Sequence, residues 1–202
     1  MVDASERGAA PEPDEHLLER RVGGQTLVQG HFLEMRRDVV ALPSGREATR
    51  EYVVHPGAAV IVPLLDDGRL VLERQYRYPV GRVLVEFPAG KIDPDEPLLT
   101  CARRELLEET GYSAREWAYA GVMHNAPAYS TEGIHLFFAR GLVAGKASLD
   151  EGEFIETVLM DEDELHALAA AGELTDVKTL VALLWLSRWR AGAWALQWQA
   201  PA

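Results

Sequence analysis

One predicted helix places acidic side chains where an ordinary amphipathic helix would not have them. The segment Pro97–Thr110 has helical periodicity, with a proline in its first turn and Gly111 just beyond its end. Glu105 and Glu109 are four residues apart, so they share a face that borders the apolar side of the helix. Glu108 lies one step further round. Any fold of this chain must therefore accommodate three neighbouring carboxylates.

This arrangement is unfavourable unless something compensates the charge. Like charges at this spacing repel by about 0.2–0.5 kcal/mol even in water, and desolvation at an apolar edge adds to the cost. The helix dipole also disfavours acids in the last turn. A divalent cation is the simplest compensation. A solvated helix, with Glu108 paired to Arg104, is the alternative that the helix alone leaves open.

Strand-like segments surround this helix. Ala58–Leu65 is a continuous apolar run, and a turn at Asp66–Arg69 leads into a returning strand, Leu70–Tyr76. The order of the remaining elements favours an α/β fold with a mixed sheet between helices. Further strands are expected at 83–87, 118–124, 134–139 and 154–160, and further helices at 162–171 and 177–190.

The N-terminal part of the chain has a different character. Residues 1–21 are expected to form a disordered tail, since they begin with small, proline-rich and charged residues. Residues 22–55 predict a small antiparallel sheet, with strand-like runs at Gly23–Met35, Arg37–Leu42 and Arg50–His55. A second domain is expected over residues 56–202.

Composition excludes several classes of function. A net charge of −12 argues against a general grip on nucleic acid and against anionic membrane surfaces. No apolar stretch is long enough to cross a bilayer, and the N-terminus lacks the pattern of a secretory signal. Because Cys101 is the single cysteine, no disulfide can form within the chain, and a cytoplasmic location is expected.

A motif extends the acidic helix in both directions. Gly90, Glu96 and the run Arg104–Tyr112 follow the pattern G-x5-E-x7-R-E-U-x-E-E-x-G-U, in which U is a bulky apolar residue. This pattern resembles the Nudix box, and every specified position is matched. The resemblance implies the α/β/α sandwich of the Nudix fold, and metal-dependent hydrolysis of a nucleoside diphosphate linked to another group.

The resemblance also implies roles for the residues of the box. Mg²⁺, with Mn²⁺ as the alternative, would polarise the pyrophosphate and activate a water molecule. Gly90 would permit a tight turn, and Glu96 would pair with Arg104 to orient the helix and loop. The implied metal ligands are Glu105, Glu109 and the backbone carbonyl of Ala89, with Glu108 nearby in a catalytic role.

Features outside the box resemble the ADP-ribose pyrophosphatase branch of the family. Pro127 lies 15 residues beyond Tyr112, within a segment resembling P-G-x-S-x-E in which Ala128 replaces the usual glycine. The Gln75–Arg77 and Glu86–Gly90 segments also resemble this branch. It implies that Arg77 binds phosphate, that Glu132 binds a ribose hydroxyl and that Glu86 contacts substrate. Within Asp150–Glu153, Glu151 is the first candidate for general base and Glu153 the second, a choice that the sequence leaves open.

The expected reaction is hydrolysis of ADP-ribose to AMP and ribose 5-phosphate. A hydrolase acting on another nucleotide sugar, such as GDP-mannose, is the nearest alternative. A Nudix module that binds a nucleotide without cleaving it is less favoured, because Glu105, Glu108 and Glu109 are all present. The resemblance also implies a homodimer in which the N-terminal sheet contributes to the active site.

Overall fold

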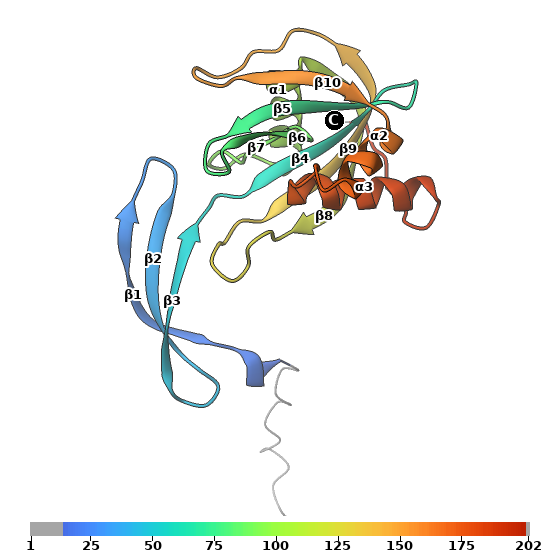
Figure 1. Cartoon of the computed structure of the whole chain (residues 1–202). Coiled ribbons are helices and arrows are strands. Elements are labelled where there is room, and N and C mark those ends of the chain that lie inside the picture. Colours follow the sequence, from blue (N-terminus) through green and yellow to red (C-terminus); the bar gives the residue numbers. More distant parts are fainter. Residues whose placement is uncertain (1–13, 201–202) are drawn as a thin grey trace, which may run out of the picture. The chain divides into compact units, whose positions relative to one another are not determined.

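The computed structural model describes residues 14–200 and divides the chain into two compact units (Figure 1). Residues up to His55, together with Ala128–Ser130, form the first unit, and the remaining residues from Pro56 form the second. Residues 1–13 of the expected tail lie outside the described part. None of the described helices combines the length and apolar character needed to span a membrane.

The first unit is a three-stranded antiparallel sheet in the order β1-β2-β3. The expected tail is too long at its C-terminal end, because Arg20 already pairs with Ala41 in this sheet. The long first run of the prediction is interrupted by a turn in which the Gly30 amide donates to the Leu33 carbonyl at 2.8 Å. The elements are η1 (Glu15–Leu17), β1 (Arg20–Gln29), β2 (Glu34–Ala41) and β3 (Glu47–Val54).

The second unit is built on a seven-stranded mixed sheet. Its main path is β10-β5-β4-β9-β8, with β6 paired to β5 and β7 paired to β4. The β4 and β9 strands are parallel and the other pairs are antiparallel. The strands are β4 (Ala58–Leu64), β5 (Leu70–Arg77), β6 (Arg82–Glu86), β7 (Ala89–Lys91), β8 (Tyr112–Met123), β9 (Ile134–Ala144) and β10 (Ile155–Met160). The helices are α1 (Leu98–Thr110), α2 (Glu162–Ala170) and α3 (Val177–Arg190).

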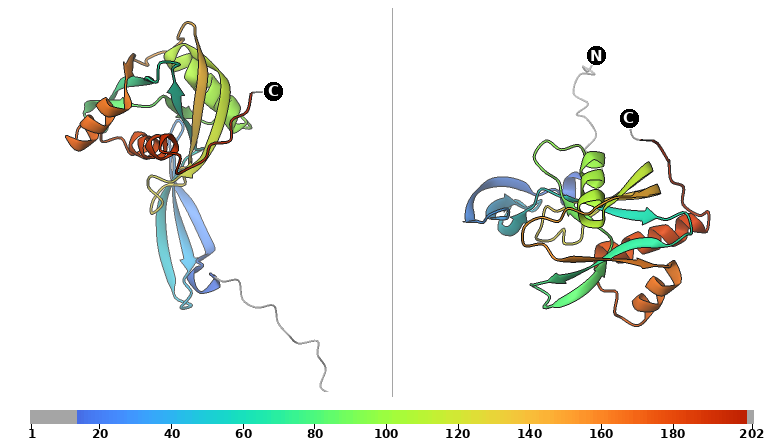
Figure 2. Two further views of the ribbon diagram at one scale, coloured as in Figure 1. Left: turned by 90° about the vertical axis from the view of Figure 1, so that its right-hand side faces the viewer. Right: turned by 90° about the horizontal axis from the view of Figure 1, so that it is seen from above.

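Helices cover both faces of this sheet (Figure 2). Alternate residues of a strand point to opposite faces, so β4 is apolar throughout because it is buried on both sides. Ala59 and Ile61 pack in the core beneath α1, whereas Val60 and Val62 pack in the core that includes α2 and α3. The predicted α/β/α sandwich with a mixed sheet and a separate small antiparallel sheet is therefore confirmed.

Local signals fix the ends of the helices. Gly111 ends α1 in the left-handed conformation, with φ at 76°, where a side chain would be strained. Asp161 and Glu164 form a capping box at the start of α2. The Asp176 side chain accepts from the Thr179 amide at 2.9 Å and caps α3. These caps place the last turn of α1 and the first turn of α3, where the candidate site lies.

Candidate active site

The last two turns of α1 bury two of the three box carboxylates. Glu105 is 8% exposed and Glu109 is 5% exposed, which is rare for glutamates without a matched cation. The Glu108 side chain, by contrast, is 39% exposed. The face shared by Glu105 and Glu109 therefore points towards the protein, and the solvated-helix alternative applies to Glu108 alone.

The short strand β7 lies against these carboxylates. Its Ala89 amide donates to Oε2 of Glu109 at 2.9 Å. A Cβ atom on Gly90 would lie 1.9 Å from Cδ of Glu105, so only glycine leaves room for this carboxylate. The prediction that Gly90 permits a tight turn is therefore wrong, because Gly90 pairs with Ala59 in the sheet. A glycine is needed here because the Glu105 carboxylate lies close to its backbone.

Arg104 joins the helix to the preceding loop. Its Nε and Nη2 atoms each donate to the Glu96 carboxylate at 2.9 Å, which forms the pair expected from the motif. Its Nη1 atom donates to Glu105 at 2.7 Å and to Glu108 at 3.1 Å. The guanidinium holds the pKa of Glu96 down at about 2 and is itself stabilised in its charged form. One guanidinium thus donates hydrogen bonds to three carboxylates.

The buried carboxylates are electrostatically strained. Burial raises the pKa of Glu109 to about 10, with added repulsion from Glu73, Glu105 and Glu153. Burial is also the main reason why the pKa of Glu105 is raised, although Arg104 opposes it. In the absence of a counter-charge, this part of the molecule does not favour full ionisation.

Glu73 on β5 belongs to the same group and was missed by the sequence analysis. It is fully buried, and neither carboxylate oxygen has a hydrogen-bond partner within residues 14–200. Burial raises its pKa to about 8, while Lys178 and Arg77 oppose the shift and Glu86 adds to it. A charged residue in an apolar strand carries no sequence signal of burial, because its surroundings are set by β6 and β10.

Arg77 and Glu86 form a bidentate pair between β5 and β6. The Nε and Nη2 atoms of Arg77 donate to the two Glu86 oxygens, each at 2.8 Å. Lys178 of α3, also missed from the sequence, donates to Oε2 of Glu86. Glu86 is 1% exposed, and both of its oxygens accept hydrogen bonds from these cations. Although burial acts to raise the pKa of Glu86, the two cations hold it below its usual range.

The two candidate bases differ in their surroundings. The charge of Glu153 acts on both Glu105 and Glu109, which brings it into the electrostatic environment of the box. Glu151 is exposed in the same loop. Glu132 lies in the loop between β8 and β9. The structure thus gathers most of the residues predicted for the site.

The donor set suits a hard divalent cation. Among the described residues, no three side chains of His, Cys, Asp or Glu form a ready-made metal cage. Mg²⁺ rarely uses such a cage, since it binds one or two carboxylates and keeps waters and substrate phosphates as its other ligands. Glu105 and Glu109, with β7 beside them, meet that requirement, and burial raises the pKa of both, so a nearby cation would favour their ionised forms.

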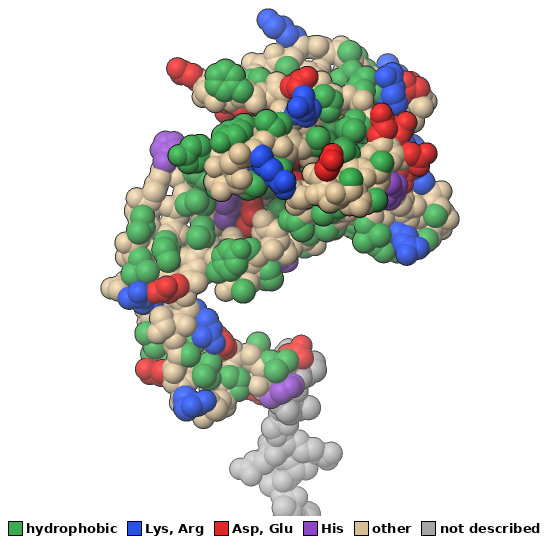
Figure 3. Space-filling view, in the orientation of Figure 1, with side chains coloured by type: hydrophobic (Ala, Val, Ile, Leu, Met, Phe, Trp, Pro, Cys, Tyr) green, Lys and Arg blue, Asp and Glu red, His purple; other side chains and the backbone are tan. Residues whose placement is uncertain are grey.

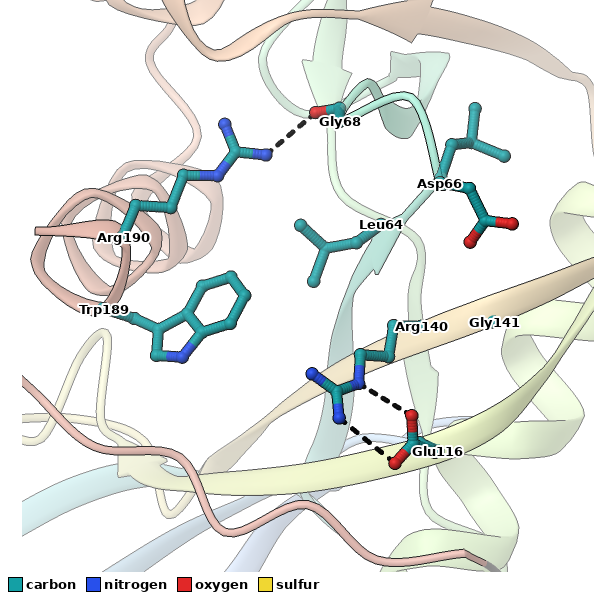
Figure 4. A pocket seen from close by; sticks show the side chains of 9 residues that line it. Leu64, Asp66, Gly68, Glu116, Arg140, Gly141, Trp189 and Arg190 are labelled. Carbon is teal, nitrogen blue, oxygen red and sulfur yellow. Dashed lines mark hydrogen bonds and ion pairs between the residues drawn. The ribbon is translucent and has the colours of Figure 1, made fainter. Parts of the chain in front are cut away.

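A pocket elsewhere in the second unit is separate from these carboxylates (Figure 4). It lies at the turn between β4 and β5, where Leu64 and Trp189 face it. Its arginines are already engaged, since Arg140 pairs with Glu116 and Arg190 donates to the Gly68 carbonyl. None of the box residues lines it. The chemistry of the candidate site therefore depends on the carboxylate group.

Comparison with known proteins agrees with this geometry. The family model described as the NUDIX domain matches residues 54–183. The chain belongs to the Nudix hydrolase family, whose members generally depend on a divalent metal.

Individual relatives narrow the class further. The chain is 33% identical over 172 residues to the ADP-ribose pyrophosphatase of Bacillus subtilis (strain 168), covering 84% of this chain and 93% of that protein. It is 35% identical over 137 residues to the GDP-mannose pyrophosphatase of Cronobacter sakazakii, covering 63% and 71%. A crystal structure of an ADP compounds hydrolase has a TM-score of 0.78 at 24% identity, covering 87% of this chain and 96% of that one, which supports the fold.

Proposed function

We propose that this protein hydrolyses the pyrophosphate of ADP-ribose, giving AMP and ribose 5-phosphate, with Mg²⁺ or Mn²⁺ as cofactor. The observation that carries the proposal is the pair of buried carboxylates, Glu105 and Glu109, beside the strand β7. In this strand Gly90 leaves room for the Glu105 carboxylate. Similarity to an ADP-ribose pyrophosphatase over most of both chains supports this substrate. The similarity to a GDP-mannose pyrophosphatase keeps that substrate as the alternative.

The residues of the box have distinct roles in this proposal. Glu105, Glu109 and the carbonyl of Ala89 hold the metal, which when bound polarises the pyrophosphate and lowers the pKa of an attacking water. Glu96 and Arg104 hold the helix against the loop, which would keep the carboxylates in position for the metal. Glu108 assists from the exposed side of the helix.

Glu153 takes the proton of the attacking water in this proposal. Its charge reaches both Glu105 and Glu109, whereas Glu151, the first candidate from the sequence, is exposed. Comparison of the Glu153→Gln and Glu151→Gln variants tests the assignment. The Glu153 variant should lose about 100-fold or more in kcat, within the range expected for general-base catalysis, and the Glu151 variant much less. The reverse order would return the role to Glu151.

Substrate recognition involves residues outside the box. Arg77 binds a phosphate oxygen, and Glu86 acts through Arg77 by holding one edge of its guanidinium. A guanidinium has five N–H donors, so an arginine that donates twice to Glu86 keeps donors for a ligand. Glu132 binds a ribose hydroxyl.

A homodimer completes the proposal, with a cytoplasmic location. The β1 strand is an edge of the small sheet and carries exposed apolar side chains at Val22 and Val28. Apolar side chains are also exposed over the β5–β6 hairpin, at Tyr76, Tyr78 and Val83 (Figure 3). Exposed apolar side chains in groups are typical of surfaces that bind another chain. Sedimentation analysis would test the dimer.

The substrate is tested by direct assay. Purified protein is incubated separately with ADP-ribose, GDP-mannose and UDP-glucose, with and without Mg²⁺, and products are separated by chromatography. Glu109→Gln serves as the inactive variant. Glu156→Gln is the matched control, because Glu156 is exposed and pairs with Arg74 outside the box.

The outcomes separate the alternatives. Metal-dependent release of AMP and ribose 5-phosphate, lost in the Glu109 variant but not in the Glu156 variant, supports the proposal. Preference for GDP-mannose would keep the chemistry and replace the substrate. Tight binding of ADP-ribose without turnover of any compound would indicate a non-catalytic sensing module.

A further inference from the structure

Lys178 is a buried cation in the first turn of α3 that the box does not explain. It is 9% exposed and donates to Oε2 of Glu86, and its Nζ atom lies 3.1 Å from Oδ2 of Asp176. Burying a lysine is costly unless its charge is compensated. A lysine in this position is therefore expected to serve the groups around it.

The groups around Lys178 form a chain that leads to Arg77. Glu73 and Glu86 are Cα partners on adjacent strands, and like charges placed directly opposite each other are destabilising. Lys178 offsets this repulsion, because its charge acts on both carboxylates. Glu86 can then stay ionised in the interior and accept both hydrogen bonds from Arg77.

The orientation of Arg77 depends on this chain. Its side chain is 36% exposed, so part of the guanidinium can reach solvent while Nε and Nη2 stay on Glu86. Without Lys178, Glu86 would lose a buried hydrogen-bond donor and its ionised form would be less stable beside Glu73, so it would hold the two Arg77 donors less firmly. The guanidinium would then lose its fixed direction.

We propose that Lys178 is a positioning residue, which acts through Glu86 to hold Arg77 in the orientation that binds a substrate phosphate. This inference rests on the proposed function, since it needs Arg77 to contact a phosphate. It predicts that Lys178 affects substrate binding through Arg77 and has no independent effect on the ligand. A double-mutant cycle measures this dependence directly.

The experiment compares ADP-ribose kinetics in the presence of Mg²⁺ for the full chain and its variants. Lys178→Met should raise KM about 10-fold with a smaller change in kcat, because misplacement of a binding group weakens a charge-assisted contact. Arg77→Ala should raise KM by at least as much. The double variant should match Arg77→Ala alone, and Lys178→Arg should recover most of the loss.

A matched control separates positioning from stability. Thr179 is the neighbour of Lys178 on α3, and its Oγ1 accepts from the Phe87 amide at 3.0 Å without carrying charge. Thr179→Val should lower the melting temperature but leave KM unchanged. If Lys178→Met does not fold, Lys178→Gln keeps an N–H donor for Glu86 and replaces it in the cycle.

Two results would overturn the inference. If the effects of Lys178 and Arg77 multiply in the double variant, Lys178 acts on the ligand independently. If Lys178→Met and Thr179→Val change only the melting temperature, Lys178 is structural. Absence of turnover in the wild-type protein would instead reject the proposed function, so the two failures are distinguishable.

Discussion

Two carboxylates, one in each unit, lie against glycines, and they differ in how their charge is treated. A Cβ atom on Gly24 would lie 1.8 Å from Oδ1 of Asp38 in the small sheet, and a Cβ atom on Gly90 would meet Glu105 in the same way. Oδ2 of Asp38 accepts from Arg21 at 2.8 Å and from Tyr52 at 3.0 Å. The pKa of Asp38 is lowered, mainly by the hydrogen bond from Arg21. The pKa of Glu105, in contrast, is raised by burial.

The difference teaches how to recognise a functional carboxylate. The same steric device admits both side chains, but only the pKa of Asp38 is lowered: its Oδ2 accepts from Arg21 and Tyr52, although its Oδ1 has no hydrogen-bond partner among the described residues. The box carboxylates remain under-compensated, which is costly for folding and useful for binding a cation. Substitutions that remove the charge should therefore have opposite effects on stability in the two units.

The largest effect is expected for Glu109→Gln. The amide keeps the shape but removes a carboxyl group that must take up a proton to be buried, so the metal-free protein at neutral pH should melt at a higher temperature than the wild type. Metal-dependent turnover should fall more than about 100-fold, because even groups that only support a metal ligand cost up to that amount. Calorimetry in a chelating buffer and steady-state kinetics measure the two effects. A lower melting temperature would show that the carboxylate is already compensated in the metal-free protein.

Gly90→Ala should have the next largest effect. The new Cβ would meet Cδ of Glu105 at 1.9 Å and its two oxygens at 2.0 and 2.2 Å, all at the free end of a flexible side chain. Glu105 can therefore swing away and the fold should survive. We expect turnover to fall about 10–100-fold, from displacement of one carboxylate.

The matched variant for this experiment is Gly68→Ala. Gly68 lies in the turn between β4 and β5, and no atom lies within 4 Å of an added Cβ, although its φ of 90° strains any side chain. It should lower stability without changing the Mg²⁺ dependence. Equal Mg²⁺ dependence in Gly90→Ala and wild type, measured by titration of activity with Mg²⁺, would refute the steric argument.

Asp38→Asn tests the other side of the comparison. Because Asp38 is ionised and held by Arg21 and Tyr52, loss of its charge should lower the melting temperature, in contrast to the rise expected for Glu109→Gln. Thermal unfolding of both variants in the same chelating buffer compares the signs directly. A rise for both would mean that burial alone, rather than the balance of partners, decides the stability of each carboxylate.

Much of this architecture could be predicted because its signals are local. The helix expected at Pro97–Thr110 is observed as α1, and Gly111 ends it, because periodicity and a glycine stop lie within one segment. The strand β7 was missed, since its three residues begin only two residues after β6 and only their pairing with β4 defines them.

The residues of the candidate site likewise divide into those that local sequence signals predict and those that they do not. The pairing of Glu96 with Arg104 follows from the motif, because both residues lie within one loop and helix. Glu73 and Lys178 could not be found from the sequence, since a charged residue on a strand or helix is more often solvated. Their burial depends on contacts between β5, β6 and α3, which are distant in the chain.

The smallest effect is expected for Glu96→Gln, and its pH dependence sharpens the comparison. Arg104 lowers the pKa of Glu96 from the usual 4.5 to about 2, so the folded state favours the ionised form. The pair therefore contributes stability above pH 4.5, and this contribution is lost as the pH falls from 4.5 towards 2.

Urea unfolding of wild type and Glu96→Gln at several pH values measures this contribution. The wild type should be more stable by roughly 1 kcal/mol at pH 7, the upper end for ion pairs with partial exposure. The difference should shrink at each step below pH 4.5. A difference that does not depend on pH would mean that Glu96 stabilises the loop through shape and hydrogen bonding. The charge of Arg104 would then compensate only Glu105 and Glu108. The carboxylates of the box would in that case need less added positive charge than the raised pKa of Glu109 indicates.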